Sequence, residues 1–249
     1  LGMQVQTCYY HIRLLRQAGL IELVEFVEKQ GGMAKKFKAS ANALSLIINE
    51  KWQSFASSHA KTPAFFKPFV SGNHFDAKIV LGSPEPHGRY RARASEFCAA
   101  EFAMLIGSFA SFSFPLFYLD TEIKEKTKKE NLVLFGGPKV NMIVDEINSS
   151  LPIKFEEKTF AIKSSLSGRK YEEDVGLIEL VENPFNKSKK ILVLAGSNHT
   201  ATRVAVLALL THRSEVEKGN SFDKSVLAKV VRGFDEDGDG VADSIEVLE

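Results

Sequence analysis

The sequence predicts a protein of the α+β or α/β class, in which a small helix-and-hairpin unit precedes an α/β domain with a mixed, largely parallel sheet. Two observations predict this order. Apolar residues recur every three or four positions from Val5 and then alternate with acidic residues from Leu20, which indicates a helix followed by a strand. Beyond Asp76, short apolar runs end in glycine-containing turns and continue as helical patterns, which is typical of parallel strands in an α/β layer.

Composition and charge indicate a globular chain with two different ends. Of the 249 residues, 44% are hydrophobic and 25% are charged, so a packed core is expected. The net charge of +1 hides an asymmetry, because residues 1–40 carry six Lys and Arg against three Glu, whereas residues 213–249 carry five Lys and Arg against ten Asp and Glu. A basic start and an acidic end predict two different partners.

The sequence also predicts a cytoplasmic protein without a membrane span. Cys8 and Cys98 form neither a disulfide framework nor a zinc-ligand spacing, which fits a reducing compartment. No signal-peptide pattern is visible at the N-terminus. Residues 102–118 are uncharged, but Gly107 and Pro115 interrupt them, so a buried helix followed by a buried strand is expected there.

The spacing of the apolar residues divides the first forty residues into a helix and a hairpin. A helix is expected from Val5 to Gly19, a residue suited to a left-handed C-cap. A strand is expected at residues 20–28, a turn at 29–33 and a basic returning strand at 34–40.

This stretch, TCYYHIRLLRQAGLIELVE…GGMAKKFKAS, resembles the recognition helix and wing of ArsR-type winged-helix transcription regulators. The pattern of that family is matched by His11, Ile12, Leu15, Ala18, Gly19 and Leu20. The resemblance implies a partial winged helix-turn-helix over residues 1–60 that binds double-stranded DNA. A helix predicted at residues 41–58 could pair two subunits, which makes a homodimer the expected state.

The side chains that would contact DNA form two groups. Polar side chains at the start of a recognition helix meet base edges, whereas Lys and Arg neutralise phosphates. The candidates for base contact are Gln4, Gln6, Thr7 and Tyr10. The candidates for phosphate contact are Arg13, Arg16, Lys35, Lys36 and Lys38. The alternative is a helix–hairpin unit whose charges are merely solvated.

The following region is predicted to hold a linker and then the α/β domain. Residues 61–75 contain two prolines and a glycine, which favours a linker, and residues 76–249 form the domain. The turns that follow its parallel strands gather at one sheet edge, where ligands often bind. The glycines expected there are Gly82, Gly136, Gly137 and Gly196.

An enzyme is not expected at this edge. His87, Arg89, Arg91 and Arg93 could attract a phosphate, but no nucleotide-binding glycine motif occurs. Residues 197–203 hold Ser, His, Thr and Arg together, without a nucleophile elbow or a carboxylate to orient His199. An enzyme on this edge would need a ligand bound at residues 136–141 or 196–202.

Two segments of the domain, NLVLFGGPKVNMIVDEIN and KKILVLAGSNHTATRVAVLALL, are similar to the C-terminal region of archaeal S-layer-like proteins. In those proteins a GGP-x-x-N segment precedes an apolar run with AG and TR-A. The resemblance covers residues 76–249 and implies an archaeal domain that self-associates or senses a ligand, with no catalytic residues. Residues 151–190 alternate between apolar and polar, which predicts an antiparallel insert.

The acidic stretch FDEDGDGVADSIE near the end of the chain fits a calcium loop of the EF-hand type, with Gly240 at the sharp turn. Its candidate ligands are Asp235, Asp237, Asp239, Val241, Asp243 and Glu246. Residues 222–234 are predicted to be the entering helix, and about one turn of helix is expected after the loop. Calcium is therefore the predicted cofactor; the alternative is a solvated acidic tail.

Together these patterns favour a dimeric DNA-binding transcriptional regulator with a C-terminal S-layer-like domain for sensing or self-association. The alternative is a structural protein of the surface-layer type with a calcium-stabilised domain.

Overall fold

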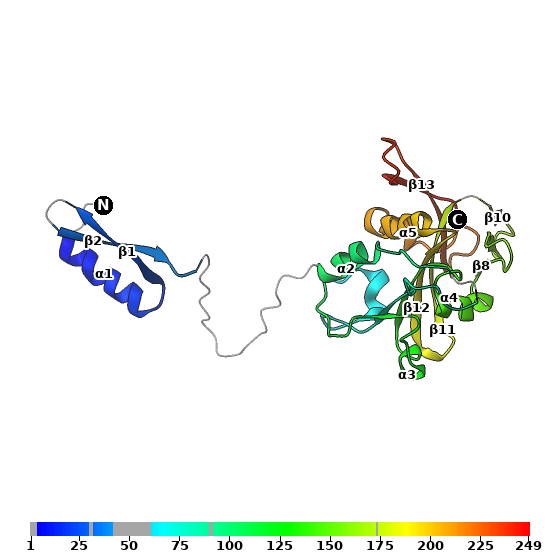
Figure 1. Cartoon of the computed structure of the whole chain (residues 1–249), viewed down its shortest axis with the longest axis horizontal. Helices are drawn as coiled ribbons and strands as arrows, with labels where there is room; N and C mark the ends of the chain where they lie inside the picture. Colours follow the sequence, from blue (N-terminus) through cyan, green and yellow to red (C-terminus); the bar gives the residue numbers. More distant parts are fainter. Residues whose placement is uncertain (1–3, 30–31, 42–60, 90–91, 173) are drawn as a thin grey trace. The chain divides into compact units, whose positions relative to one another are not determined.

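The structure is a computed structural model that describes residues 4–29, 32–41, 61–89, 92–172 and 174–249. The chain divides into two compact units, Leu1–Phe55 and Ala56–Glu249 (Figure 1). The helix predicted at residues 41–58 lies, beyond residue 41, outside the described residues.

Unit 1 contains the helix α1 (Val5–Gln17) and the strands β1 (Ile21–Lys29) and β2 (Gly32–Ala39). The helix ends before Gly19, whose φ of +71° is the left-handed conformation that glycine adopts without strain. β1 and β2 pair antiparallel, with Ile21 opposite Ala39. The predicted helix, glycine stop and hairpin are therefore confirmed.

Unit 2 is built on a seven-stranded sheet with the strand order β14-β13-β11-β12-β7-β5-β6. Its strands are β5 (Lys78–Leu81), β6 (Phe117–Leu119), β7 (Leu132–Phe135), β11 (Val175–Asn183), β12 (Asn186–Gly196), β13 (Leu227–Phe234) and β14 (Ser244–Val247). The pairs β12–β7, β7–β5 and β5–β6 are parallel. The pairs β12–β11, β11–β13 and β13–β14 are antiparallel. A mixed sheet is confirmed, but the prediction that it is largely parallel is wrong, because one half of it is antiparallel.

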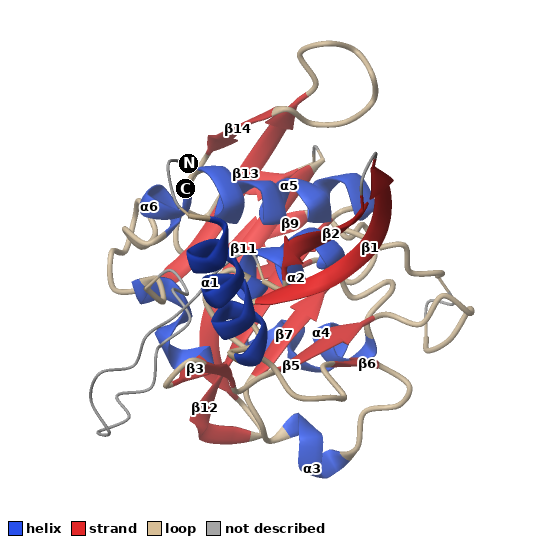
Figure 2. Cartoon of the chain, turned by 90° about the vertical axis from the view of Figure 1, so that its left-hand side faces the viewer, coloured by secondary structure: helices blue, strands red, loops and turns tan. Residues whose placement is uncertain are grey.

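Both faces of this sheet are covered. The strand residues alternate, so Val133 and Phe135 join one core cluster while Leu132 and Leu134 join the other. The first cluster lies under α2 (Ala99–Gly107), α5 (His199–Thr211) and the 3-10 helix η1 (Ala64–Phe69). Figure 2 shows α5 lying over the strands of the large sheet.

The second cluster lies under α4 (Met142–Ile147) and a small antiparallel sheet. That sheet consists of β8 (Ile153–Phe155), β9 (Ile162–Ser164) and β10 (Lys170–Tyr171). With the β11–β12 hairpin it confirms the predicted antiparallel insert at residues 151–190. The remaining short elements are β3 (Val70–Ser71), β4 (His74–Phe75), α3 (Glu125–Lys128), η2 (Asn148–Ser150) and α6 (Arg213–Val216).

The interpretation of residues 61–75 as a linker is wrong for most of the segment. Phe65, Phe66 and Phe69 of η1 are buried in the first cluster. The side-chain amide of Asn131 donates to the carbonyl oxygen of Pro68 at 3.1 Å and so anchors η1 to the start of β7. The segment contains four phenylalanines in fifteen residues. Burying their side chains favours a packed segment more strongly than the two prolines favour a linker.

The uncharged segment 102–118 forms part of α2 and the beginning of β6, as the sequence predicts. Phe102 and Ile106 are buried, but β6 is an edge strand on which Phe117 is 56% exposed, so the strand is not buried as predicted. Among the described residues, no helix is both long and apolar enough to cross a membrane.

Candidate functional site

In unit 1 the structure gathers five of the predicted DNA contacts around one hollow. A hollow of about 770 Å³ lies between α1 and β2, and its rim includes Gln6, Tyr10, Arg13, Arg16 and Lys35. All five are exposed. The remaining helix candidates, Gln4 and Thr7, are also exposed but do not line it.

The other two wing lysines are paired within the hairpin. Lys36 Nζ lies 2.8 Å from Glu25 Oε1, and Lys38 Nζ lies 2.9 Å from Glu22 Oε1. A carboxylate beside each of these lysines offsets part of its positive charge. Lys36 and Lys38 therefore add less net positive charge to the surface of unit 1 than Arg13 and Arg16.

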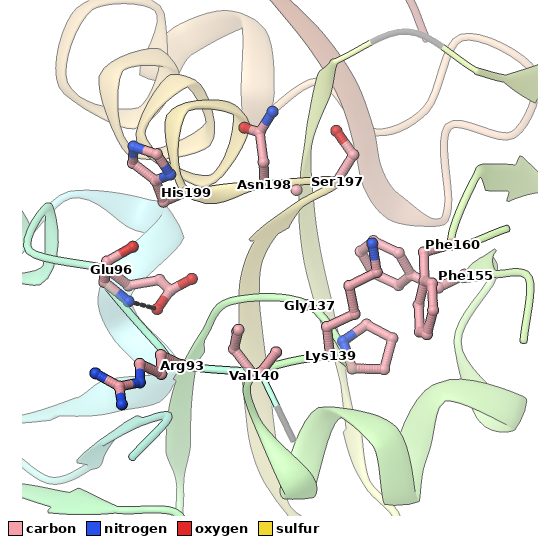
Figure 3. Close-up of a pocket in the computed structure, with 14 residues that line it drawn as sticks. Arg93, Glu96, Gly137, Lys139, Val140, Phe155, Phe160, Ser197, Asn198 and His199 are labelled. Carbon is pink, nitrogen blue, oxygen red and sulfur yellow. Dashed lines mark hydrogen bonds between the residues drawn. The ribbon is translucent and has the colours of Figure 1, made fainter. Parts of the chain in front are cut away.

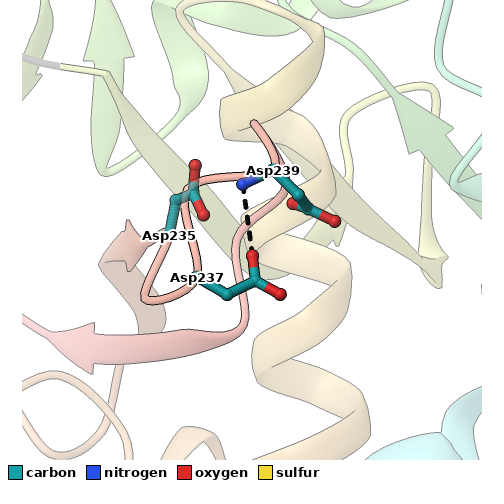
Figure 4. Close-up of side chains that lie close together, drawn as sticks. All are labelled: Asp235, Asp237 and Asp239. Carbon is teal, nitrogen blue, oxygen red and sulfur yellow. Dashed lines mark hydrogen bonds between the residues drawn. The ribbon is translucent and has the colours of Figure 1, made fainter.

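The acidic loop of unit 2 connects β13 to β14, and three of its carboxylates lie close together (Figure 4). One oxygen from each of Asp235, Asp237 and Asp239 lies within 4.8 Å of the others, and all three residues are exposed. Asp235 accepts the backbone N–H groups of Gly238 and Gly240 at 2.7 and 2.8 Å, and both glycines have a left-handed φ. The loop thus holds three negative charges near one point, which favours a bound cation.

The flanks of this loop differ from the predicted helices. Residues 227–234 form the strand β13 and residues 244–247 the strand β14, so the prediction of an entering helix and an exiting helical turn is wrong. The valines of this segment suit a strand as well as a helix, and pairing with β11 decides between them.

Two of the remaining candidates, Asp243 and Glu246, do not join the three aspartates. Asp243 Oδ2 accepts the backbone N–H of Glu236 at 2.9 Å, and Glu246 lies on β14 opposite Arg232. Val241 donates its own N–H to Asp239 Oδ1 at 2.8 Å. The structure therefore brings together the first three predicted ligands and not Asp243 or Glu246.

At the other predicted edge, the turns that follow β7 and β12 meet and form an open pocket of about 250 Å³ (Figure 3). Gly137 and Gly196 line it, as expected, together with the segment around Arg93 and Glu96. His199, at the first turn of α5, and Lys139, after β7, also line it. Gly82 and Gly136 do not line the pocket. Gly82 lies against the backbone of Val140, and Gly136 lies against Val140 and Glu96.

The other basic residues considered for this edge have different places. Arg89 Nη2 lies 3.0 Å from Asp145 Oδ1 on α4, and Arg91 lies outside the described residues. His87 Nε2 lies 2.6 Å from Asp120 Oδ2, and its Nδ1 lies 2.7 Å from the Glu85 carbonyl oxygen. Of the three that the structure describes, His87, Arg89 and Arg93, only Arg93 lines the pocket.

Asp120 joins three elements through its buried carboxylate, which is 3% exposed. It accepts the backbone N–H of Ser83, after β5, at 2.9 Å and that of Met142, at the start of α4, at 2.7 Å. His87 is its third partner. Burial opposes the charged form of His87, but the Glu85 carbonyl and the Asp120 carboxylate outweigh burial and raise the pKa of His87.

The raised pKa of His87 predicts a pH dependence of stability. A group whose pKa is higher in the folded state contributes stability that is complete below its unfolded value, about 6.5, and is lost as pH rises through the folded value. We expect the free energy of unfolding of unit 2 to fall over this range, and His87→Gln to flatten the fall. Urea unfolding from about pH 5.5 to about pH 8.5 measures it. His74→Gln is the control, because within the described residues the hydrogen bonds of the His74 ring go to serine hydroxyls and not to a carboxylate; equal slopes in both variants would contradict the prediction.

Four residues that shape this edge were not singled out from the sequence: Glu96, Asp120, Asn141 and Phe160. Asn141 carried a readable signal, since an asparagine directly before a helical pattern is a typical N-cap. Asp120 and Glu96 follow no helix or strand pattern that marks them. Asp120 comes to the edge because β6, which it follows, lies beside β5, and Glu96 comes to it from the segment before α2.

Comparison with known proteins locates a family resemblance in unit 2. Residues 107–212 match the model of the S-layer like family, outer domain. A similar protein, the uncharacterized protein MJ0954 of Methanocaldococcus jannaschii, is 35% identical over 82 residues, which are 33% of this chain and 16% of that protein. The chain thus spans about a sixth of the length of that relative.

The matched region runs from the end of α2 to the end of α5 and contains both glycine turns of the pocket. The predicted S-layer-like character is therefore confirmed for this part of unit 2. The chain contains, at residues 107–212, a region similar to the outer domain of S-layer-like proteins.

Proposed function

We propose that this chain is a DNA-binding regulator in which unit 1 contacts duplex DNA and unit 2 is a non-catalytic domain for sensing or self-association. The observation that carries the proposal is the gathering of Gln6, Tyr10, Arg13, Arg16 and Lys35 around one hollow beside α1. Glutamine and tyrosine can hydrogen-bond base edges, while the three cations can neutralise phosphates. Such a protein works in the cytoplasm.

A homodimer is part of this proposal. α1 has no buried residue among those described, so its side chains are free to contact DNA. Two copies of the chain would present two recognition helices to the two half-sites of a symmetric DNA site.

Fluorescence anisotropy with an operator-length DNA duplex tests DNA binding by the full chain. Arg13→Gln is expected to weaken binding several-fold and to lower the slope of log affinity against log salt by about 1. Lys36→Gln is the matched variant, and its effect should be smaller because Glu25 already compensates the charge of Lys36. Absence of any salt-dependent binding by the unmodified chain would overturn the proposal.

A second candidate function is a structural protein of the surface-layer type with a calcium-stabilised domain. Two observations favour it: the match of residues 107–212 to the S-layer like family, and the cluster of Asp235, Asp237 and Asp239 in the β13–β14 loop. In this proposal a calcium ion fastens the loop and the adjoining C-terminal strand.

Calorimetric titration with calcium tests this second candidate. An exposed loop with three carboxylates is expected to bind weakly, with a dissociation constant of about 10⁻⁴ to 10⁻³ M. The double variant Asp235→Asn with Asp237→Asn should abolish the heat, whereas Glu246→Gln should leave it unchanged, because Glu246 lies on β14. No heat from the unmodified chain, or equal loss in both variants, contradicts the predicted site.

A further inference from the structure

The pocket at the edge of the large sheet is not used by either proposal above, and its floor is built from backbone. Gly137 and Gly196 approach so closely that a side-chain carbon on Gly137 would lie 3.0 Å from the carbonyl oxygen of Gly196. A carbon on Gly196 would lie 2.5 Å from the backbone of Ala201 in α5. Any larger residue at either position would fill the pocket or displace the helix, so the two glycines keep the space open.

Cationic side chains and the start of a helix meet in this pocket. Arg93 and Lys139 line it as cations, and His199 lines it from the first turn of α5. The 13-residue helix α5 begins there, with the side chain of Asn198 accepting the N–H of Ala201. Within the described parts of the chain, no acceptor contacts the N–H groups of His199 and Thr200. An anion at this helix start would therefore meet free N–H donors as well as the cations.

One carboxyl group lies in the same wall. Glu96 is 8% exposed, and its Oε2 accepts the N–H of Ser95 at 2.8 Å. Its Oε1 faces the turn after β7, where a side-chain carbon on Gly136 would lie 3.0 Å away. Burial raises the pKa of Glu96, against the opposing effects of nearby backbone N–H groups and His199. A buried carboxyl at a pocket wall offers a ligand one polar contact distinct from the cations.

Two aromatic side chains form the opposite wall. Phe155 is 3% exposed, and Phe160 lies beside it in the turn between β8 and β9 (Figure 3). Phe160 has a φ of +57°, and among the described residues it is the non-glycine residue with a left-handed backbone. This conformation costs about 1 kcal/mol or more for a bulky side chain, and such strain gathers at functional positions. Lys139 Nζ lies 4.5 Å from the centre of the Phe160 ring, at the mouth of the pocket.

We propose that this pocket binds a small organic anion, with its carboxylate or phosphate group at the start of α5 and its apolar part against Phe155 and Phe160. The volume of about 250 Å³ is below the range of drug-sized ligands, which indicates a small metabolite. The binding itself stands on unit 2 alone. Only a regulatory role, in which the anion is the signal sensed by the chain, rests on the proposed DNA-binding function.

Direct titration of the full chain tests the site with four probes: phenyl phosphate, benzoate, inorganic phosphate and benzyl alcohol. At least one of the two aromatic anions should bind, and about tenfold more tightly than inorganic phosphate or benzyl alcohol, because only these probes carry both groups. Arg93→Gln and Lys139→Gln should each weaken that binding about five- to tenfold. Both residues are exposed, so neither substitution disturbs the core. The matched control is Lys187→Gln, an exposed lysine near the other end of β12.

The variant Phe160→Gly distinguishes an effect on ligand binding from an effect on stability. Glycine accepts a φ of +57° without strain, so the melting temperature should not fall by more than a few degrees. Binding of the aromatic anion should nevertheless weaken about tenfold, while any binding of inorganic phosphate stays unchanged. Failure of both aromatic anions to bind, or binding that Arg93→Gln, Lys139→Gln and Phe160→Gly all leave unchanged, would overturn the proposal. Neither result depends on DNA binding, which the anisotropy experiment tests separately.

Discussion

Replacing Asn141 by alanine is expected to lower the free energy of unfolding of unit 2 by about 3 to 5 kcal/mol. Asn141 is fully buried, and its side-chain amide donates to the carbonyl oxygens of Val80 at 3.2 Å and Phe135 at 2.9 Å. Its Oδ1 accepts the N–H groups of Ile143 and Val144 at the start of α4. One side chain therefore joins β5, β7 and α4 at the edge of the sheet. Alanine would remove the side-chain partner of four backbone groups.

Asn198→Ala is the matched variant for this experiment. Asn198 is also an N-cap, at the start of α5, but it is exposed and accepts only the N–H of Ala201, at 2.8 Å. Its loss should therefore cost about 1 kcal/mol. Urea unfolding followed by circular dichroism measures both variants. Equal losses in the two would show that Asn141 acts as a simple helix cap and not as a connection between strands.

The fold was predictable where local pattern and tertiary pairing agree. β7 and the second half of β12 are apolar runs followed by glycine turns and capped helices, and all of these features are visible in the sequence. Residues 227–234 were not predictable, because their apolar residues fit a helix and a strand equally well. Pairing with β11 makes this segment a strand, and the local sequence contains no signal that predicts this pairing.

The candidate sites divide in the same way. The spacing of Asp235, Asp237 and Asp239 depends only on the loop, and the structure does bring these three together. The predicted role of Glu246 as a ligand required a helix after the loop to bring its carboxylate back to the aspartates. Glu246 lies on the strand β14 instead. At the pocket, the glycine turns were expected at one edge, whereas Glu96 and Phe160 arrive from distant segments and carry no motif.

A second large loss of stability is expected on replacing Glu249, whose carboxylate is fully buried. Its Oε1 accepts the hydroxyl groups of Ser167 at 2.5 Å and Tyr171 at 2.6 Å, and its Oε2 accepts from Ser164 at 2.8 Å and Asn220 at 3.1 Å. These four donors come from the small sheet and from the segment before β13, so the carboxylate connects both to the end of the chain. Burial opposes the charge, but the four hydrogen bonds outweigh burial and hold the pKa of Glu249 below its usual value.

Glu249→Ala is therefore expected to lower the free energy of unfolding by about 3 to 5 kcal/mol, because it leaves buried donors unpaired. Glu172→Ala is the control, since Glu172 is exposed and pairs only with Lys170 at 3.2 Å; its loss should stay below about 0.5 kcal/mol. Folding lowers the pKa of Glu249. Its contribution to the free energy of unfolding is therefore present above the unfolded pKa, about 4.3, and disappears as pH falls through the folded pKa. The difference in the free energy of unfolding between Glu249→Ala and the unmodified chain should thus shrink in acid. A difference that stays constant from neutral pH to about pH 2 would mean that the side chain stabilises unit 2 by packing and not by its charge.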